Sequence, residues 1–351
     1  MIVNTDEKLV SIIIPNYNKG QFISETLESI INQTYNRWEA IIVDDGSNDD
    51  SIDIIKSYQI KDNRFCLIER NREPKGGSVC RNIGIDNASG DFIIFLDSDD
   101  LIIPSMLENR LNSFKIYPDN DFLIFPTGVF YTKIGDNNSK IIPKKTEHLK
   151  YFLRNNFQWT VMSPIWKKDF LLKLNGYDEE YNKLEDIEFH IRALLEKNVK
   201  YYIIRNNHID NFYRQSDARI VAKDYNHFFQ QYVTATLLYF KKTSIIIKKS
   251  NLPNKSLYLR DLLGSLLICI TAILDAYEDK KITENQKNKL INSLLDYNGS
   301  LNQLSTIDIV LIKLYIKGYE VRLHKIRGYK NISRKIILSK TMYYMNKIRR
   351  T

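Results

Sequence analysis

The chain has 351 residues, of which 43% are hydrophobic and 26% are charged. This composition excludes a disordered or fibrous protein, and the length is enough for about two domains with buried cores. The formal net charge is +9, but residues 321–351 contain ten Lys or Arg and no acid, so the first 320 residues are close to neutral.

Neither a zinc site nor a membrane span is expected. The three cysteines are far apart and are not spaced as metal ligands, which fits a reducing compartment. Asp6 and Glu7 precede the first apolar run, so we expect a strand there and not a signal peptide. The longest apolar segment, residues 262–274, is shorter than the roughly 20 residues that cross a bilayer, and it is predicted to be a buried helix.

Strand-like and helix-like segments alternate along the first part of the chain. We expect strands at 9–14, 39–43, 65–68 and 91–96, and helices at 21–33, from about 50 to 58 and at 76–88. Short polar loops follow the strands, which is typical of a mostly parallel α/β sheet. From about residue 221 only helices are expected, at 225–247, 256–277, 284–296 and 303–320. The sequence therefore predicts two regions, 1–220 and 221–351.

A dinucleotide-binding Rossmann domain has the same alternation, but it needs a Gly-x-Gly-x-x-Gly turn after the first strand. Here the turn is Pro15-Asn16-Tyr17-Asn18-Lys19-Gly20, which lacks the phosphate-binding glycines. Acidic residues instead follow the second and fourth expected strands. The sequence therefore predicts that a nucleotide diphosphate is held through a metal.

The segment from Phe92 to Asp100 has the composition of a buried strand that ends in carboxylates. Asp97, Asp99 and Asp100 follow five apolar residues. Charges so close together repel each other unless a cation compensates them. At the carboxyl edge of a sheet, such oxygens suit a divalent metal that binds a phosphate. The simpler interpretation is that residues 98–100 only start the next helix.

These motifs, in this order, resemble family 2 glycosyltransferases, which have the GT-A fold. The resemblance extends from residue 9 to about 215 and is carried by Val10–Asn18, Asp44–Ser47, Gly77–Gly84, Ala88–Asp91, Asp97-Ser98-Asp99, Gly176-Tyr177-Asp178 and Glu185-Asp186. It implies a Rossmann-like GT-A nucleotide-sugar domain over residues 1–220, followed by an all-helical region over residues 221–351.

The resemblance implies a nucleotide-diphosphate sugar, usually a UDP-sugar, and Mn²⁺ or Mg²⁺. Asp99 would bind the metal that bridges the two phosphates, and Asp97 would lie beside the metal or the ribose. A metal there stabilises the leaving diphosphate as a Lewis acid. Asp44 and Asp45 correspond to the pair that binds uracil and ribose.

Further residues of the nucleotide site follow from the same resemblance. Pro15 and Tyr17 correspond to the wall beside the base, although Tyr17 could equally be an ordinary buried aromatic. Arg81 and Asn82 correspond to contacts on the nucleotide side. Many members of the family carry a metal-binding His after a Tyr-Arg pair, and Gln215 stands there in this chain.

Without that His, the metal would be bound by Asp99, phosphates and waters, which is common for Mg²⁺. Arg214, which precedes Gln215, could still contact the diphosphate.

Residues 184–195 form an amphipathic segment with Asp186 in its first turn, where the helix dipole favours an ionised carboxylate. The resemblance implies that Asp186 is the general base, with Glu185 as the substitute. The simpler interpretation is an acidic first turn that only stabilises its helix. Trp159 is a candidate platform for the acceptor sugar, because aromatic faces stack on sugar rings, but a buried core tryptophan explains it as well.

The basic residues of the C-terminal tail alternate with apolar ones, which fits peripheral contact with an anionic membrane. A solvated helix is the simpler interpretation. Nucleic acid ranks last, because the helical half has no nucleic-acid-binding motif. We expect a cytoplasmic protein, at the inner face of the cell membrane if the tail binds lipid.

Together these features predict an inverting, metal-dependent glycosyltransferase of the hexosyl or N-acetylhexosaminyl type. Its acceptor would be a hydroxyl of a glycan or lipid-linked molecule in bacterial surface-polysaccharide assembly. Two alternatives stay open. One is a non-catalytic sugar-nucleotide-binding scaffold protein. The other is a nucleotidyltransferase, which should carry a basic glycine-rich triphosphate loop, and Lys19-Gly20 alone is too little.

Overall fold

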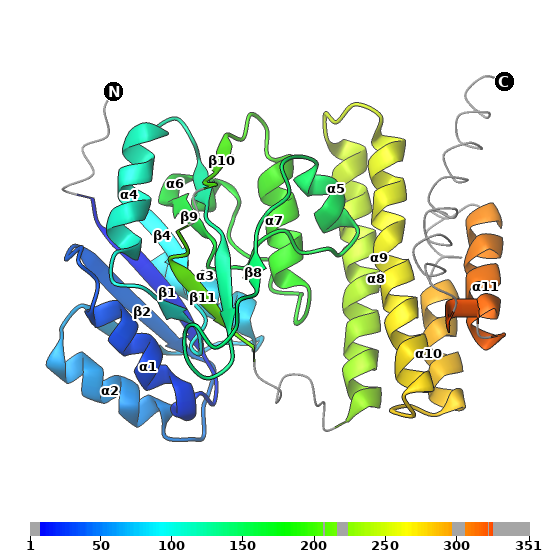
Figure 1. Ribbon diagram of the computed structural model, residues 1–351, viewed down its shortest axis with the longest axis horizontal. Helices are drawn as coiled ribbons and strands as arrows, with labels where there is room; N and C mark the ends of the chain where they lie inside the picture. The colour runs from blue at the N-terminus through cyan, green and yellow to red at the C-terminus, as the bar shows by residue number, and fades with distance from the viewer. Residues whose placement is uncertain (1–7, 206–207, 216–223, 297–305, 322, 326–351) are drawn as a thin grey trace. The chain divides into compact units, whose positions relative to one another are not determined.

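Figure 1 shows the computed structural model of the chain, which describes residues 8–205, 208–215, 224–321 without 297–305, and 323–325. The chain forms two compact units. The first comprises residues 1–146 and 158–220, and the second comprises residues 147–157 and 221–351. Residues 147–157 thus pack with the C-terminal helices, although the sequence-based division places them in the first region.

The first unit is built on a seven-stranded sheet with the order β10-β6-β9-β4-β1-β2-β3. Its strands are β1 (Val10–Asn16), β2 (Trp38–Asp44), β3 (Phe65–Glu69), β4 (Phe92–Phe95), β6 (Phe122–Ile124), β9 (Pro164–Lys167) and β10 (Tyr201–Ile203). All neighbouring strands pair in parallel except β9, which is antiparallel to both β4 and β6. The predicted fold class, a mostly parallel α/β sheet followed by a helical region, is confirmed.

Helices pack against this sheet because successive strand residues point to opposite faces. The helices of the first unit are α1 (Gly20–Ile31), α2 (Ser51–Lys61), α3 (Gly77–Asn87), α4 (Met106–Ile116), α6 (Lys168–Lys173) and α7 (Glu185–Leu195). Ile12 and Ile14 share one buried cluster with apolar residues of α1, α2 and α4. Ile13 points the other way, toward Gly84 of α3.

Gly84 allows the close approach of α3 to the sheet. A Cβ atom at this position would lie 2.3 Å from Cγ2 of Ile13, so any larger side chain would force the helix outward. The position of α3 matters for the site, because this helix begins beside the carboxyl ends of β1, β2 and β4.

A second, four-stranded sheet has the order β5-β11-β7-β8 and was not expected from the sequence. Its strands are β5 (Leu101–Ile102), β7 (Thr127–Phe130), β8 (Lys140–Ile141) and β11 (Asn211–Arg214). Because β11 pairs with β5, Arg214 comes to lie beside the acidic turn that follows β4.

The second unit is helical and contains α5 (His148–Leu153), α8 (Tyr225–Lys249), α9 (Lys255–Glu278), α10 (Glu284–Asp296), α11 (Thr306–Glu320) and a short 3-10 turn, Leu323–Lys325. The loop after α5 is tied to α9 by two hydrogen bonds from Arg154 to the buried Asp261, at 3.0 and 2.6 Å. The boundaries of α8, α9, α10 and α11 lie within about three residues of the predicted ones, whereas α5 and the 3-10 turn were not predicted.

The central helix α9 is long and apolar enough to cross a membrane by length and composition, and 67% of its most apolar window is buried inside the protein. Its apolar residues, including Leu262, Leu266, Ile270 and Leu274, pack in the interior of the unit, as predicted for residues 262–274. Most of the predicted basic tail, residues 326–351, lies outside the described residues.

Candidate active site

A cavity of about 290 Å³ opens where β1, β2 and β4 end. We call it the strand-end cavity; it is lined by Pro15, Asn16, Tyr17, Lys19, Asp45, Gly77, Cys80, Asp97, Ser98 and Asp99. Five predicted site residues, from three separate segments of the chain, therefore meet in one place. Tyr17 is 51% exposed, so it is an open wall of the cavity and not a buried aromatic.

Each acidic side chain of the Asp97-Ser98-Asp99 motif faces a cation. Nζ of Lys19 lies 2.7 Å from Oδ2 of Asp99, which is buried. A guanidinium nitrogen of Arg81 lies 2.9 Å from Oδ1 of Asp97. The repulsion between the two carboxylates is thus compensated by two positive side chains that start from different elements.

The oxygen atoms around this cavity are of the kind that a divalent metal binds together with phosphates. In the described part of the chain, no group of three or more His, Cys, Asp or Glu side chains could hold a metal by itself. Mg²⁺ is commonly bound by one or two carboxylates together with phosphates and water. Asp97 and Asp99 supply such carboxylates. In addition, the buried Oδ1 of Asn16 finds no hydrogen-bond partner among the described residues.

Asp44 and Asp45 have different surroundings, although they are adjacent. Oδ1 of Asp44 accepts hydrogen bonds from the backbone of Gly46 and Ser47, and its Oδ2 accepts from Asn16 and the Ser47 hydroxyl. Asp44 therefore organises the turn after β2 and is not among the residues that line the cavity. Asp45 lines it, and accepts a hydrogen bond from Arg70 at 2.5 Å.

Arg81 is a buried centre between the two groups of acids. Besides Asp97, its guanidinium lies 3.6 Å from Asp186 and 4.0 Å from Glu185. Burial by itself lowers the pKa of Arg81, but the carboxylates of Asp186 and Asp97 outweigh this and raise its pKa above the ordinary value. Arg81 thus stays charged and joins the strand-end cavity to the start of α7.

Asp186 lies in the first turn of α7, as predicted, and its side chain is 27% exposed. Burial raises its pKa to about 7, the charges of Glu185 and Asp97 act in the same direction, and Arg81 opposes them. The sequence predicted that the helix dipole keeps this carboxylate ionised. The loss of hydration, which raises the pKa of Asp186, is therefore a stronger effect than the helix dipole. A carboxylate with this pKa can accept a proton near neutral pH.

Arg214 supports the acidic turn from outside the cavity. Its Nε donates to the backbone oxygen of Asp99 at 2.8 Å, its backbone N–H donates to Asp100, and its guanidinium pairs with Glu25 at 2.7 Å. The structure therefore places Arg214 where it holds the backbone of the Asp-Ser-Asp motif, and not among the residues that line the cavity.

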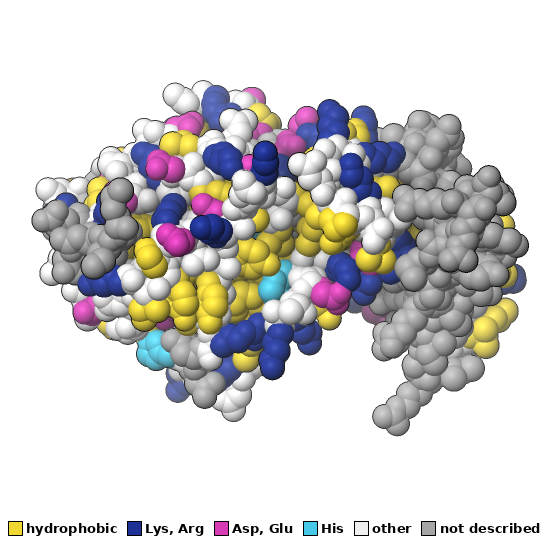
Figure 2. Space-filling view, turned by 90° about the horizontal axis from the view of Figure 1, so that it is seen from above, with side chains coloured by type: hydrophobic (Ala, Val, Ile, Leu, Met, Phe, Trp, Pro, Cys, Tyr) yellow, Lys and Arg dark blue, Asp and Glu magenta, His cyan; other side chains and the backbone are white. Residues whose placement is uncertain are grey.

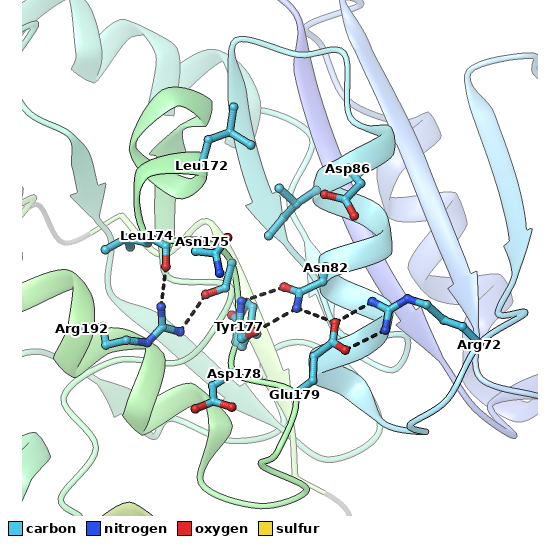
Figure 3. Close-up of a pocket in the computed structure, with 12 residues that line it drawn as sticks. Arg72, Asn82, Asp86, Leu172, Leu174, Asn175, Tyr177, Asp178, Glu179 and Arg192 are labelled. Carbon is cyan, nitrogen blue, oxygen red and sulfur yellow. Dashed lines mark hydrogen bonds and ion pairs between the residues drawn. The ribbon is translucent and has the colours of Figure 1, made fainter. Parts of the chain in front are cut away.

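Two other predicted residues also lie away from the strand-end cavity. Asn82 lines a second cavity, of about 650 Å³, and its amide contacts Tyr177 and Glu179 (Figure 3). Trp159 is 1% exposed and packs edge-on against His190, with ring centroids 5.6 Å apart. The structure thus places Trp159 in the core, where its face is no open platform for a sugar.

Sequence reasoning missed Lys19 and Arg70 as parts of the site. Both form ion pairs with cavity carboxylates, Asp99 and Asp45, that are 80 and 25 positions away in the sequence. The available signal was the need of clustered carboxylates for cations. That signal does not say which basic residue supplies the charge.

Described side chains of both charges are interspersed on the face shown in Figure 2, with Lys and Arg in several separate places. This agrees with the near-neutral charge of the first 320 residues.

The protein family and the related sequences that match this chain all point to glycosyltransferases. The family described as "Glycosyl transferase family 2" matches residues 11–172. An uncharacterized glycosyltransferase of Haemophilus influenzae is 30% identical over 245 residues, which cover 69% of this chain and 92% of that protein. TuaG of Bacillus subtilis, named for teichuronic acid biosynthesis, is 40% identical over 103 residues, 29% of this chain and 40% of TuaG.

Solved structures that share the fold include two with a bound nucleotide sugar. Residues 1–349 of TarS from S. aureus, in complex with UDP-GlcNAc, superpose with a TM-score of 0.64 at 20% identity, over 95% of this chain and 92% of that one. The mannosyltransferase PcManGT from Pyrobaculum calidifontis, in complex with GDP-Man and Mn²⁺, gives a TM-score of 0.50 at 14% identity, over 96% and 86% of the two chains.

Proposed function

We propose a reaction for this chain, which belongs to glycosyl transferase family 2. In this reaction the enzyme moves a sugar from a UDP-sugar to an acceptor hydroxyl. The transfer inverts the anomeric carbon and uses a divalent metal. One observation carries the proposal. Arg81 connects Asp97, in the strand-end cavity, to Asp186 at the start of α7. A place for a diphosphate thus adjoins a carboxylate that can act as a base.

The strand-end cavity takes the nucleotide in this proposal. Tyr17 and Pro15 lie beside the base, and Asp45 accepts hydrogen bonds from uracil or ribose. Asp99 and Asp97 would hold Mn²⁺ or Mg²⁺. When bound, such a metal stabilises the negative charge of the leaving group as a Lewis acid. The complexes of the two structural neighbours with UDP-GlcNAc, and with GDP-Man and Mn²⁺, support this assignment.

Asp186 acts on the acceptor side. Its carboxylate takes the proton of the acceptor hydroxyl while that oxygen forms its bond to the anomeric carbon. The bond from the anomeric carbon to the diphosphate oxygen breaks in the same step, so the sugar inverts. Arg81 orients the carboxylate of Asp186 and offsets the negative charges of the neighbouring acids. The pKa of Asp186, about 7, suits a general base at neutral pH. Glu185 is the substitute for this role.

The acceptor is a hydroxyl of a glycan or lipid-linked molecule, and the transferred sugar is a hexose or an N-acetylhexosamine. The similarity to TuaG and the fold shared with TarS support a role in the assembly of a bacterial surface polysaccharide. We place the enzyme in the cytoplasm, in contact with the inner face of the cell membrane.

A screen of UDP-sugars tests this proposal. The full chain is incubated with each UDP-sugar and Mn²⁺ or Mg²⁺, and released UDP is measured with and without a chelator. We expect metal-dependent release from one or a few of them. Binding of UDP without any release, even with acceptor glycans present, would support a sugar-nucleotide-binding scaffold instead. No UDP binding at all would contradict the assignment of the cavity.

A further inference from the structure

A network of side chains holds the segment between α6 and α7 (Figure 3). We propose that Glu179 is a positioning residue, which acts with Arg72 and Asn82 to hold Tyr177 in place and, through Tyr177, the Arg81–Asp186 pair. The inference rests on the proposed role of Asp186. It assigns a function to the acid that follows the Gly176-Tyr177-Asp178 motif.

Glu179 receives three short hydrogen bonds. The two terminal nitrogens of Arg72 donate to its two carboxylate oxygens at 2.7 and 2.6 Å, and Nδ2 of Asn82 donates to Oε1 at 2.8 Å. The hydrogen bonds from Arg72 lower the pKa of Glu179. A paired, two-point contact of this kind fixes direction as well as distance.

Asn82 passes this restraint to the backbone of Tyr177. Its Nδ2 donates to the Tyr177 oxygen at 2.9 Å, and its Oδ1 accepts from the Tyr177 N–H at 2.7 Å. The preceding Gly176 has φ +62°, and a Cβ atom there would lie 2.4 Å from Oδ1 of Asn82. The glycine is therefore required both by its backbone conformation and by the close approach of Asn82.

The side chain of Tyr177 connects this network to the catalytic pair. Its ring stacks on Phe189 of α7, with centroids 4.1 Å apart and planes 11° apart. The guanidinium of Arg81 lies 5.3 Å from the centre of the same ring, and 3.6 Å from Asp186. A shift of Tyr177 would therefore move both the cation that orients Asp186 and the helix that carries it.

The other end of the network reaches the strand-end cavity. The backbone oxygen of Arg72 accepts a hydrogen bond from Arg70, and Arg70 also donates to Asp45, which lines the cavity. Glu179 thus links a loop on the nucleotide side to the segment on the acceptor side. Loss of Glu179 removes no direct contact of Arg70 or Asp45, so we expect it to affect the transfer step more than nucleotide binding.

The variant Glu179→Gln tests the proposal, with Glu196→Gln as the matched control. Glu196 has nearly the same exposure as Glu179, forms one ion pair with Lys173 at 2.8 Å, and follows the far end of α7. We expect kcat to fall by about ten- to a hundredfold in Glu179→Gln, because displacement of a reacting group by about 1 Å can cost that much. KM for the UDP-sugar and the melting temperature should stay near the wild-type values.

A second readout does not depend on activity. Backbone amides of residues 176–186 should exchange with deuterium faster in Glu179→Gln than in the control, because their restraint is lost. Arg72→Gln removes the same contact from the more exposed partner, and it should give the same pattern if Glu179→Gln does not fold.

A rescue experiment separates positioning from a general loss of stability. Asn82→Asp places two carboxylates against each other and should lower kcat. In the double variant Asn82→Asp/Glu179→Gln, the amide at position 179 can donate to the carboxylate at position 82. Residue 82 still accepts the hydrogen bond from the Tyr177 N–H, so activity should partly return. Wild-type kcat and wild-type exchange in both Glu179→Gln and Arg72→Gln would overturn the inference. A wild type that releases no UDP would instead overturn the proposed function, and the exchange data would still test the network.

Discussion

At the scale of single residues, the site depends on carboxylates whose charges are balanced by lysine and arginine side chains. Asp99 faces Lys19, Asp97 and Asp186 share Arg81, and Asp45 faces Arg70. Asp99 and Asp186 play different parts in the proposed function. Burial raises the pKa of Asp186 at the start of α7, while Asp99 lies at the end of the sheet beside a lysine.

Asp99→Asn should lower turnover by at least about a hundredfold, because Lewis-acid help to the leaving group is worth several kcal/mol. The melting temperature should change little, since Lys19 is 28% exposed and can turn to water. A turnover assay with the UDP-sugar and Mn²⁺ measures the loss of activity, and a thermal melt measures the melting temperature. Asp91→Asn is the control, because Asp91 pairs with Lys8 at the same distance, 2.7 Å, but on the surface. Full activity in Asp99→Asn would refute the metal role.

The pKa of Asp186 also predicts a pH dependence. A base must be deprotonated to act, and burial raises the pKa of this carboxyl to about 7, so kcat should fall as the pH drops below about 7. The wild-type profile of kcat against pH should show this acid limb. The residual activity of Asp186→Asn should not show it. An acid limb near the ordinary carboxyl pKa of about 4 would contradict the environment described for Asp186.

The raised pKa of Asp186 also determines the direction in which folding stability changes with pH. Between the ordinary and the raised pKa, the folded protein binds a proton at Asp186 that the unfolded chain has lost. Folding stability from this group therefore decreases as the pH rises from about 4 to about 7. Activity and stability thus change in opposite directions over the same range, which is the expected cost of holding a base in a partly buried place.

At the scale of elements, the site depends on how closely α3 approaches the sheet, because this helix carries Arg81. Gly84→Ala would place a methyl group 2.3 Å from Cγ2 of Ile13, in a fully buried contact. Overpacking of this kind costs about 1–3 kcal/mol, so the free energy of unfolding should fall by that amount and kcat should fall as Arg81 shifts.

Denaturant unfolding measures the loss in Gly84→Ala, and Asp86→Ala, on the exposed side of the same helix, is the control. The double variant with Ile13→Ala should lose less than the sum of the two single variants, because the clash is removed. An unchanged unfolding free energy in Gly84→Ala would show that α3 does not pack as closely as described.

The sequence was informative where a local pattern determines the structure. The helices at 225–247, 256–277 and 284–296 were predicted almost to the residue, since each has an apolar stripe and a break at its end. The strands β5 and β8 have two residues each, too few for any alternation to be visible, so the second sheet was missed. The grouping of residues 147–157 with the C-terminal helices is non-local and leaves no mark in the sequence.

The same distinction holds in the candidate site. Asp97 and Asp99 were predicted to lie at the carboxyl edge of the sheet because they follow a buried strand. The place of Asp45 in the same site was implied by the resemblance to family 2 glycosyltransferases. The central place of Arg81, and the use of Asn82 and Arg214 to hold backbone segments, depend on contacts across 16 to 115 positions. Such contacts follow from packing, and a single sequence does not specify them.

At the scale of the whole molecule, the strongest charge asymmetry is the basic C-terminal tail, whose residues 331–351 lie outside the described part of the chain. Each Lys or Arg near an anionic membrane contributes about 1 kcal/mol of binding. We therefore expect that removal of residues 331–351 weakens binding to anionic liposomes while UDP-sugar hydrolysis stays almost intact. Co-sedimentation with liposomes and a UDP-release assay on the same preparations measure the two effects.

Salt and lipid charge provide the controls for this prediction. Binding of the full chain should fall as salt rises, because exposed charges are screened beyond about 10 Å at 0.1 M, and it should be weak with neutral lipids. Liposome binding that survives the truncation would place the membrane contact elsewhere. A truncated chain that no longer folds would mean that the tail packs as part of the core.

We propose Asp186 as the base of a transferase whose nucleotide lies in the strand-end cavity. Comparing Asp186→Asn with the wild type, by kcat for the UDP-sugar and by calorimetric titration with UDP and Mn²⁺, tests it most directly. We predict a loss of roughly 10² to 10⁴ in kcat with a nearly unchanged Kd for UDP, because the base contacts the acceptor and not the nucleotide. A mild effect in Asp186→Asn, with the full loss in Glu185→Gln, would contradict the claim.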